Sequence, residues 1–481
     1  MRLDDLTDVV GAPRPAFGGD REVREVTRDS RRNGPATAFF AVRGERVDGH
    51  DHVSSYTGVA AFVERPVPAP PQLPVCLVPD TRRALALAAA AVAGHPTRRV
   101  PALGVTGTNG KTTVTTLIQQ AAAHLGQVVG RVGTTGATAG PRAWELGFTT
   151  PEAPVLQAVL ADMVSAGATA LTMEVSSIGL ALRRVDGIAF HGAIYTNLSR
   201  DHLDFHGDMA AYGAAKMRLF DELLRPAGGL PRALICTEAA AERPAIADVW
   251  TYGTSPDADL RLAACQATGD GLDLQVVTPE GTVEIQSRLL GHHNALNLVA
   301  ALGGLAMLGT SFADGARALA SASGPPGRLT RVASLRGPRV VVDYAHSPDA
   351  LEHALRTLRP LAVGQLWVVF GCGGDRDAGK RAAMGVVARR LADRVVLTSD
   401  NPRSEDPASI LDAIAQGAGP HAMCIVDRAA AIATAVAGAG AEDVVVIAGK
   451  GHERTQEIAG VHHPFDDHQV ASDALAVWGL P

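Results

Sequence analysis

The chain has 481 residues, of which 46% are hydrophobic and 20% charged, as in globular proteins with sizeable buried cores. The length suggests about three domains. The formal net charge of −6 at pH 7 gives no electrostatic argument for nucleic acid or an anionic membrane surface as a partner.

The sequence also lacks targeting and cross-linking patterns. No apolar run approaches the ~18 residues of a membrane span, and the N-terminus has no apolar signal core. The five cysteines have no paired spacing, which argues against a disulfide framework and against a zinc site. We therefore expect a cytoplasmic protein without membrane insertion.

Residues 1–96 mix short β-like runs with turns, and we predict that they form a first α/β domain. The run over 37–42 has the pattern of a strand. An alanine-rich helix is expected over 80–93, with the aspartate at its start as the cap. We expect residues 97–99 to form a linker. The polar stretch 29–32 is more often plain surface than a binding loop.

The middle part of the chain, 97–326, opens with Thr106-Gly107-Thr108-Asn109-Gly110-Lys111-Thr112-Thr113. An apolar run over 100–105 precedes this loop, and apolar residues at helical spacing follow it over 114–125. A strand, a glycine-bearing loop and a helix form the context in which backbone N–H groups bind phosphate. Lys111 can reach the terminal phosphates, and the Thr112 hydroxyl can ligate Mg²⁺.

The spacing of this loop departs from G-x-x-x-x-G-K-[ST] at the first glycine, so a turn that only caps a helix is the alternative. We predict a nucleoside triphosphate site. Over 97–326 apolar runs alternate with helical patterns, which predicts a mainly parallel sheet covered by helices. Glu174 follows the apolar run 171–173 and should lie at the carboxyl edge of that sheet, where ligands bind. A surface glutamate in a turn is the other interpretation.

Further along, Asp201, His202, Asp204 and His206 have a spacing that does not converge on one helix or strand face. A polar loop near the nucleotide is therefore favoured over a zinc site. Lys216 lies in a helical pattern, and the local sequence favours a solvated lysine.

Residues 324–327, Gly-Pro-Pro-Gly, mark a second hinge, and 327–481 form the predicted C-terminal domain. A helix is expected over 348–359. Four apolar runs, each expected to be a strand that ends in a polar loop, cover 340–342, 366–370, 395–399 and 444–448. Parallel strands would bring these loops to one edge.

Two arginines at the loop tips, Arg376 and Arg403, suit bidentate binding of carboxylates, although each alone is more often a surface residue. The partial glycine motif at 371–374 gives little support to a nicotinamide cofactor.

Several separated motifs together resemble those of the Mur ligases, ATP-dependent amide-forming enzymes of peptidoglycan precursor synthesis. The resemblance spans nearly the whole chain. The motifs are the loop 106–113, Glu174-Val175-Ser176-Ser177, the segment 197–204, Lys216, Pro326-Gly327-Arg328 and Asp343-Tyr344-Ala345-His346.

The resemblance implies an α/β protein of three domains: a UDP-substrate-binding domain, a central P-loop ATPase domain and a C-terminal Rossmann-like domain. It implies a catalytic set of Lys111, Glu174, His202 and Lys216. The implied ATP-binding residues are Gly107, Thr108, Asn109, Gly110, Lys111, Thr112, Thr113, Asn294, Arg328 and Asp343. In the family the lysine that matches Lys216 is carbamylated, and the implied Mg²⁺ ligands are Thr112, Glu174 and the carbamylated Lys216.

The implied substrates are UDP-N-acetylmuramoyl-L-alanyl-D-glutamate and meso-diaminopimelate, joined through an acyl phosphate made from ATP. The implied UDP-substrate contacts are Ser30, the loop around Glu45, Thr149, Thr150, Ser176, Arg184 and His346. The implied amino-acid contacts are Arg376, Asp400, Asn401, Arg403, Gly449 and Glu453. The motif over 400–403 resembles that of members selecting meso-diaminopimelate rather than lysine. We expect a monomer with small-molecule partners only.

The chain departs from the family pattern at Ile178, usually histidine, and at Leu182, glutamine in some members. Both departures bear on contacts to the muramoyl substrate. The segment 291–294 also varies, although Asn294 is kept.

Three alternatives are considered: a ligase for L-lysine or another diamino acid, a folylpolyglutamate-type ligase, and an inactive ATP-binding regulatory protein. The implied UDP domain and the 400–403 motif argue against the second, and the presence of Lys111, Glu174 and Lys216 argues against the third.

Overall fold

The computed structural model describes residues 1–44, 47–224, 232–239, 244, 246, 248–268, 271–334 and 336–479. They form two compact units. The first comprises Met1–Ala264, Gln275–Ile285 and Leu296–Ala322, and the second comprises Cys265–Leu274, Gln286–Ala295 and Ser323–Pro481. None of the helices in this described part of the chain has the length and hydrophobicity of a membrane span. The boundaries predicted at 96 and 326 stay predictions.

The N-terminal part of the first unit has its own four-stranded parallel sheet. The strands, in sheet order, are β1 (Glu25–Thr27), β2 (Thr37–Phe40), β3 (Ala60–Val63) and β4 (Val75–Leu77). The helices of this part are α1 (Leu3–Val10), η1 (Gly49–Ser55) and α2 (Thr81–Val92). Phe39 and Phe40 are both fully buried, in separate cores on the two faces of the sheet, which explains why consecutive residues of β2 are apolar.

The predicted capped helix is confirmed. The Asp80 carboxylate accepts a hydrogen bond from the Arg83 backbone N–H at 2.9 Å and so caps α2. The expected linker at 97–99 is instead part of a helical turn, α3 (Pro96–Arg99). Proline at the first position favours this turn because its fixed φ suits a helix start.

An eleven-stranded sheet forms the centre of the chain, in the order β15-β14-β13-β12-β11-β10-β5-β9-β6-β7-β8. The strands nearest the phosphate loop are β5 (Ala102–Thr106), β6 (Val129–Gly133), β9 (Ala170–Glu174), β10 (Gly192–Tyr195) and β11 (Ala233–Cys236). The outer strands are β7 (Gly136–Ala139), β8 (Arg142–Trp144), β12 (Val249–Gly253), β13 (Leu260–Ala267), β14 (Leu272–Thr278) and β15 (Gly281–Ser287).

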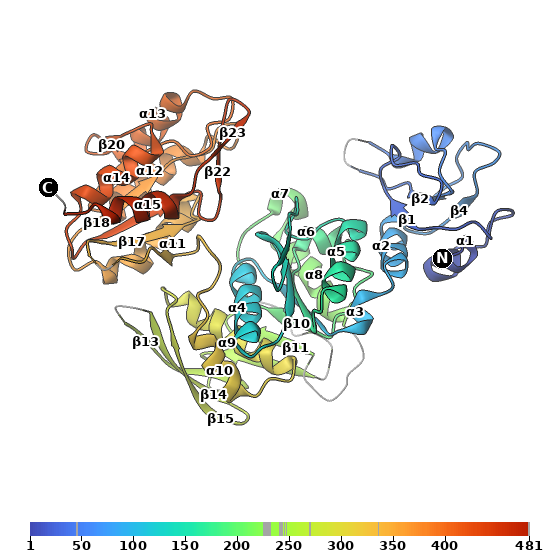
Figure 1. The fold of residues 1–481 in the computed structure, drawn as a ribbon, viewed down its shortest axis with the longest axis horizontal. Coiled ribbons are helices and arrows are strands. Elements are labelled where there is room, and N and C mark those ends of the chain that lie inside the picture. Colours follow the sequence, from blue (N-terminus) through green and yellow to red (C-terminus); the bar gives the residue numbers. More distant parts are fainter. Residues whose placement is uncertain are drawn as a thin grey trace. The chain divides into compact units, whose positions relative to one another are not determined.

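Neighbouring strands from β6 to β12 are parallel, whereas β7 and β8 pair antiparallel. The prediction of a mainly parallel sheet is therefore confirmed. The helices of this region are α4 (Lys111–His124), α5 (Ala153–Ser165), α6 (Ser177–Ala181), α7 (Leu203–His206), α8 (Met209–Asp221), α9 (His293–Met307) and α10 (Phe312–Ala320). The helix α4 (labelled in Figure 1) packs against β6 and β9, and the loop before it follows β5, the strand between β9 and β10 in the sheet.

The second unit is built on a six-stranded sheet in the order β16-β17-β21-β18-β19-β20. Its strands are β16 (Thr330–Arg331), β17 (Arg339–Asp343), β18 (Leu366–Phe370), β19 (Arg394–Leu397), β20 (Met423–Cys424) and β21 (Val444–Ala448). The four strands β17, β21, β18 and β19 are parallel, so the prediction that their polar loops open on one edge is confirmed.

Helices cover both faces of this sheet (Figure 1). Val341, Val368 and Val446 face the core formed with α11 (Pro348–Leu358), α12 (Lys380–Leu391) and α13 (Pro407–Ala418). The alternate residues of the same strands face α14 (Arg428–Gly438) and α15 (Asp467–Ala476). A hairpin of β22 (Thr455–Ile458) and β23 (Val461–Pro464) follows β21.

A buried ion pair ties the carboxyl edge of this sheet to α14 and α15. Arg428 and Asp467 have no exposed side-chain surface and form two hydrogen bonds of 2.7 Å each. The same guanidinium donates to the Ser399 carbonyl at 3.2 Å, beyond β19, and to the Ala448 carbonyl at 3.0 Å, at the end of β21. The pair therefore fixes the starts of the loops that follow β19 and β21, on either side of β18.

We predict that Asp467→Asn destabilises the second unit by about 3–5 kcal/mol, because the Arg428 charge would remain buried without its partner. Urea unfolding of the full chain measures this change. Asp473→Asn is the matched control, because Asp473 lies exposed on the same helix and should change stability by less than about 0.5 kcal/mol. Equal effects of the two substitutions would contradict this account of the pair.

Candidate active site

The phosphate loop has the backbone that its sequence predicts. Gly107 and Gly110 have φ values of 140° and 88°, in the region that favours glycine. A Cβ atom at Gly107 would lie 2.0 Å from the Thr196 hydroxyl oxygen, so a larger residue has no room. The Lys111 ammonium folds back over the loop and donates to the carbonyls of Gly107 and Thr108 at 2.9 and 2.8 Å.

Glu174 ends β9 beside this loop and is completely buried, so the interpretation as a surface turn residue is wrong. Its carboxylate accepts hydrogen bonds from the Thr112 hydroxyl at 2.9 Å and from the Thr134 hydroxyl at 3.1 Å. A third bond comes from the Thr134 backbone N–H at 2.9 Å. The parallel pairing of β5 with β9 brings Thr112 and Glu174 together, as predicted from the strand-end rule.

Lys216 is 1% exposed, so the expectation of a solvated lysine is wrong. The physical reason is that α8 packs against α6 and β5, and Tyr212, Lys216 and Leu219 share its buried face. The Lys216 Nζ donates to the Gly107 carbonyl at 2.9 Å and lies 4.2 Å from the Tyr212 ring centroid. The i, i+4, i+7 spacing of these residues was the sequence signal for burial.

Burial lowers the pKa of Lys216 from 10.5 to about 6, and the nearby positive charge of Lys111 lowers it further in the same direction. Both lysines donate to the same carbonyl oxygen of Gly107. A neutral amine therefore stands next to a cationic lysine in the loop.

The two histidines of the following loop differ in environment. His202 has a left-handed backbone (φ 52°), and its half-exposed ring lies 3.5 Å from the Asp201 carboxylate. His206 forms a 3.0 Å hydrogen bond with the Ser177 hydroxyl, and its pKa is lowered chiefly by burial. Sequence reasoning gave His206 no role, although the structure brings it to the Glu174-Val175-Ser176-Ser177 motif. Among the described residues, no three His, Cys, Asp or Glu side chains are grouped as metal ligands.

Four of the expected UDP-substrate residues gather at the end of β9. The Thr150 hydroxyl donates to the Glu174 carbonyl and accepts from the Ser176 N–H, each at 3.0 Å. Arg184 donates to the Thr150 carbonyl at 3.0 Å and pairs with Glu152 at 2.9 Å. The Thr149 hydroxyl lies 3.0 Å from that of Thr134.

The other expected UDP-substrate residues lie elsewhere. Ser30 lies half-buried in the loop after β1, and Glu45 is outside the described residues. The guanidinium of Arg28, close to Ser30, lies 3.6 Å from the carboxylate of Glu152, the residue directly before α5. His346 belongs to the second unit, where its ring bonds the Tyr344 carbonyl at 2.8 Å.

The remaining expected nucleotide residues, Asn294, Arg328 and Asp343, also belong to the second unit. The Asp343 carboxylate accepts the N–H groups of Leu329 and Ala345 at 2.8 and 2.9 Å, and burial raises its pKa. The Arg328 guanidinium stacks 5.0 Å above the Tyr344 ring.

The expected amino-acid residues lie on three loops at the carboxyl edge of the second sheet. The Asn401 amide donates to the Glu453 carboxylate at 2.8 Å. Arg403 has a φ of 52° and donates to the Gly374 carbonyl at 2.6 Å and to Glu457 at 3.1 Å.

Two more of these residues stand at the loop tips. A Cβ at Gly449 would lie 2.4 Å from the Asp400 carboxylate, which explains the glycine at this position. Arg376 is exposed at the tip of its loop.

Three functional candidates in this cluster were missed from the sequence: Lys450, Gln456 and Glu457. The Gln456 amide donates to the Asp400 carbonyl at 2.7 Å. The Glu457 N–H donates to Asn401 Oδ1 at 3.0 Å. The hairpin that carries both residues therefore holds the 400–403 loop in place, a relation that only the fold reveals.

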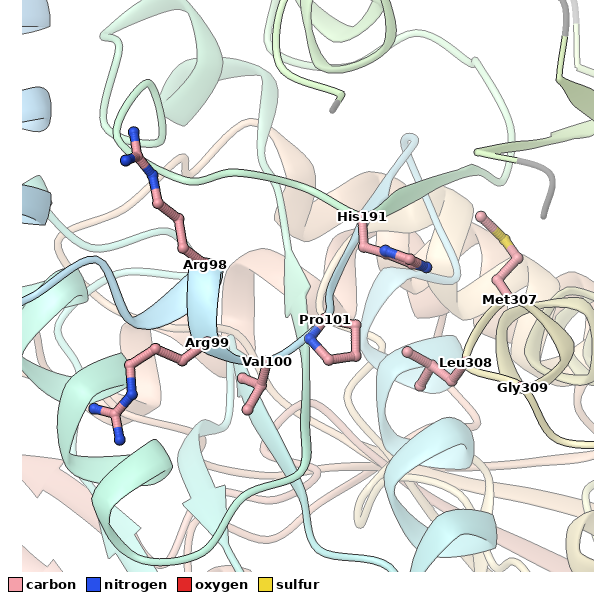
Figure 2. Close-up of a pocket in the computed structure, with 8 residues that line it drawn as sticks. All are labelled: Arg98, Arg99, Val100, Pro101, His191, Met307, Leu308 and Gly309. Atoms are coloured by element: carbon pink, nitrogen blue, oxygen red, sulfur yellow. The ribbon is translucent and has the colours of Figure 1, made fainter. Parts of the chain in front are cut away.

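A surface cavity of about 380 Å³ lies apart from these loops (Figure 2). Pro101 and His191 line it directly before β5 and β10, so it lies at the amino edge of the central sheet. In Figure 2 the His191 ring lies toward Met307 and Leu308, whereas the arginine side chains extend the other way. The cavity is therefore separate from the phosphate loop, which follows the opposite end of β5.

Comparison with known proteins identifies two family models in this chain. The model described as Mur ligase middle domain matches residues 105–305. The model described as Mur ligase, glutamate ligase domain matches residues 327–451.

Curated relatives match almost end to end. A UDP-N-acetylmuramoyl-L-alanyl-D-glutamate–2,6-diaminopimelate ligase of Chromobacterium violaceum is 44% identical over 474 residues, covering 95% of each chain. The protein of the same name from Pseudomonas aeruginosa is 43% identical and covers 97% of this chain and 98% of its own. A solved structure with that name superimposes with a TM-score of 0.73 at 33% identity, over 99% of both chains.

We predict that the folding stability contributed by Lys216 depends on pH. Since its pKa falls from 10.5 in the unfolded chain to about 6 in the folded one, the unfolded chain binds more protons between these values. Wild-type stability should therefore rise relative to Lys216→Met from about pH 6 to 10.5, by at most about 1.4 kcal/mol per pH unit. Urea unfolding in metal-free, CO₂-free buffer measures the difference, and parallel stability profiles would contradict a neutral Lys216.

Proposed function

The chain belongs to the Mur ligase family, and we propose that it joins meso-diaminopimelate to UDP-N-acetylmuramoyl-L-alanyl-D-glutamate, coupled to cleavage of ATP to ADP and inorganic phosphate. The observation that carries this proposal is the end-to-end similarity to relatives bearing that activity in their names, at 44% identity. The structure of each unit is consistent with the same activity, because the first unit carries a phosphate loop and the second carries a polar cluster suited to a zwitterionic amino acid.

The chemistry requires activation of a carboxylate. The D-glutamate γ-carboxylate attacks the γ-phosphorus of ATP and displaces ADP, giving an acyl phosphate. The amine of diaminopimelate then attacks the acyl carbon, loses a proton and displaces inorganic phosphate. Two anions meet in the first step, so cationic side chains such as Lys111 and Arg328 must offset their repulsion.

Mg²⁺ is the expected metal, and when bound it would neutralise charge on the phosphates. The buried oxygen atoms of Thr112 and Glu174, 2.9 Å apart, fit a hard cation that prefers oxygen ligands. Unmodified Lys216 would not fit, because its side chain is cationic when protonated and offers no oxygen ligand when neutral.

Carbamylation would remove this conflict. The neutral Lys216 amine, favoured by a pKa of about 6, attacks CO₂ and releases one proton. The product is a carbamate anion, a third oxygen donor beside Thr112 and Glu174. Lys216 thus belongs to the catalytic set with Lys111 and Glu174. His202, half exposed, would orient ligands around the phosphates.

The UDP-linked substrate would lie along the end of β9. Thr149, Thr150, Ser176 and Arg184 provide hydroxyl groups and a guanidinium there, with contributions from Ser30 and His346. Ile178 and Leu182 offer no side-chain hydrogen bonds, so the muramoyl part would rely on the polar residues around them.

Diaminopimelate differs from L-lysine by a distal carboxylate. Arg403 would bind that group with Arg376, and Asp400, Asn401, Gly449 and Glu453 would hold the distal ammonium and the chain. L-lysine has no distal carboxylate to bind Arg403, and the loss of such a contact discriminates strongly between substrates.

The alternative functions would require different residues. A folylpolyglutamate-type ligase would need no UDP contacts, and an inactive regulatory protein would need no buried lysine at the phosphate loop. We further propose that the enzyme works in the cytoplasm as a monomer with small-molecule partners, ATP and Mg²⁺.

An amino-acid panel tests the function. With ATP, Mg²⁺ and the UDP-dipeptide, we predict that kcat/KM for meso-diaminopimelate exceeds that for L-lysine and L-ornithine by about 10³-fold or more. Phosphate release is measured together with the peptide product by mass spectrometry. Phosphate release without the UDP-dipeptide, or only with glutamate and folate, would refute the assignment, as would equal use of L-lysine.

A further inference from the structure

Lysine is rare in this chain. Among its 44 lysine and arginine residues only four are lysines, Lys111, Lys216, Lys380 and Lys450. Arginine supplies the other 40 positive side chains, so a lysine suggests a position where a compact ammonium serves better than a planar guanidinium. Two of the four lie at the phosphate loop. Lys450 follows β21, among the residues proposed to bind diaminopimelate, and the proposed mechanism gives it no role.

The Lys450 ammonium is fully buried and saturated with hydrogen bonds. Its side chain has no exposed surface. It donates to Asn401 Oδ1 at 3.0 Å, to Glu453 Oε2 at 3.1 Å and to the Thr455 carbonyl at 2.6 Å. Three N–H groups meet three acceptors, so the ammonium has no donor left for a substrate. Lys450 therefore acts on a substrate without a direct hydrogen bond to it.

The side chains that Lys450 holds are those of Asn401 and Glu453. Glu453 Oε2 accepts from both Lys450 and the Asn401 amide, while Asn401 Oδ1 accepts from both Lys450 and the Glu457 N–H. Both side chains are thus fixed in rotation. Within the described residues no donor reaches Glu453 Oε1, and about a third of this side chain is exposed. One carboxylate oxygen is therefore presented to a ligand ammonium.

The lysine also sets the charge of the cluster. We counted the charges on the residues proposed to bind diaminopimelate and on their direct ion-pair partners. Three are negative, on Asp400, Glu453 and Glu457, and three are positive, on Arg376, Arg403 and Lys450. A balanced cluster suits a zwitterionic group, with one ammonium and one carboxylate, better than an isolated ammonium. Without Lys450 the cluster would be net negative and would favour a cationic side chain.

We propose that Lys450 is a positioning residue that sets amino-acid specificity: it fixes Asn401 and Glu453 and keeps the site neutral, which favours a zwitterionic distal group over a lone ammonium. This proposal rests on the proposed ligase function. It goes beyond that function because it assigns a role in substrate choice to a residue that does not contact the substrate.

The test is the ratio of kcat/KM for meso-diaminopimelate to that for L-lysine. In Lys450→Met we expect this ratio to fall about tenfold, while KM for ATP and for the UDP-dipeptide is unchanged. Arg394→Met is the matched control. It also removes one positive charge from this domain, but its exposed side chain lies at the start of β19, at the opposite edge of the sheet. The control should keep the wild-type ratio.

A second pair of variants shows whether the effect passes through Glu453. In a Glu453→Gln background, adding Lys450→Met should lower the ratio less than it does in the wild type. If Lys450→Met does not fold, as judged by thermal unfolding, Lys450→Gln replaces it in both backgrounds, since its amide can still donate to the Thr455 carbonyl.

The outcomes separate the two proposals. A wild-type enzyme without preference for meso-diaminopimelate would refute the proposed function. A wild-type preference that persists in Lys450→Met, with both amino acids losing kcat/KM equally, would refute the role of Lys450 alone and leave a structural role only.

Discussion

The phosphate loop depends on the close approach of two lysine side chains. Lys111 and Lys216 both donate to the Gly107 carbonyl oxygen at 2.9 Å, and Lys216 is almost fully buried. Two ammonium groups at one oxygen would repel strongly where water is excluded. Burial is the main reason that Lys216 gives up its proton, and the loss of the proton also relieves this repulsion. A nucleophilic amine is thus generated beside the carboxylate of Glu174, where the proposed reaction needs a further anion.

The same physical pattern recurs in the second unit, where buried charges hold loops that carry functional groups. Arg428 and Asp467 join the ends of β19 and β21, and Lys450 holds Glu453. Buried ion pairs add little net stability compared with apolar packing, but breaking one is costly. Their contribution here is positional. They keep loops at the carboxyl edge of a parallel sheet in one arrangement, so the polar side chains facing a ligand are pre-organised.

Sequence patterns predicted much of the fold and part of the site. Glycine spacing located the phosphate loop, and apolar runs located the parallel strands, because both depend on short stretches of chain. The buried state of Lys216 was missed, although Tyr212 and Leu219 mark its helix face as apolar. The role of Lys450 and the contact of Glu457 with the 400–403 loop could not be predicted, since they arise where segments more than 45 residues apart meet.

Direct observation of the carbamate tests the central claim that the phosphate loop makes Lys216 a neutral amine able to bind CO₂. The measurement is ¹³C NMR of the enzyme in buffer equilibrated with ¹³C-bicarbonate, compared with Lys216→Met. The account predicts a carbamate carbonyl signal in the wild type that increases with pH as Lys216 loses its proton. The signal should be absent from the variant. A fully active wild-type enzyme without this signal, or an identical signal in Lys216→Met, would contradict it.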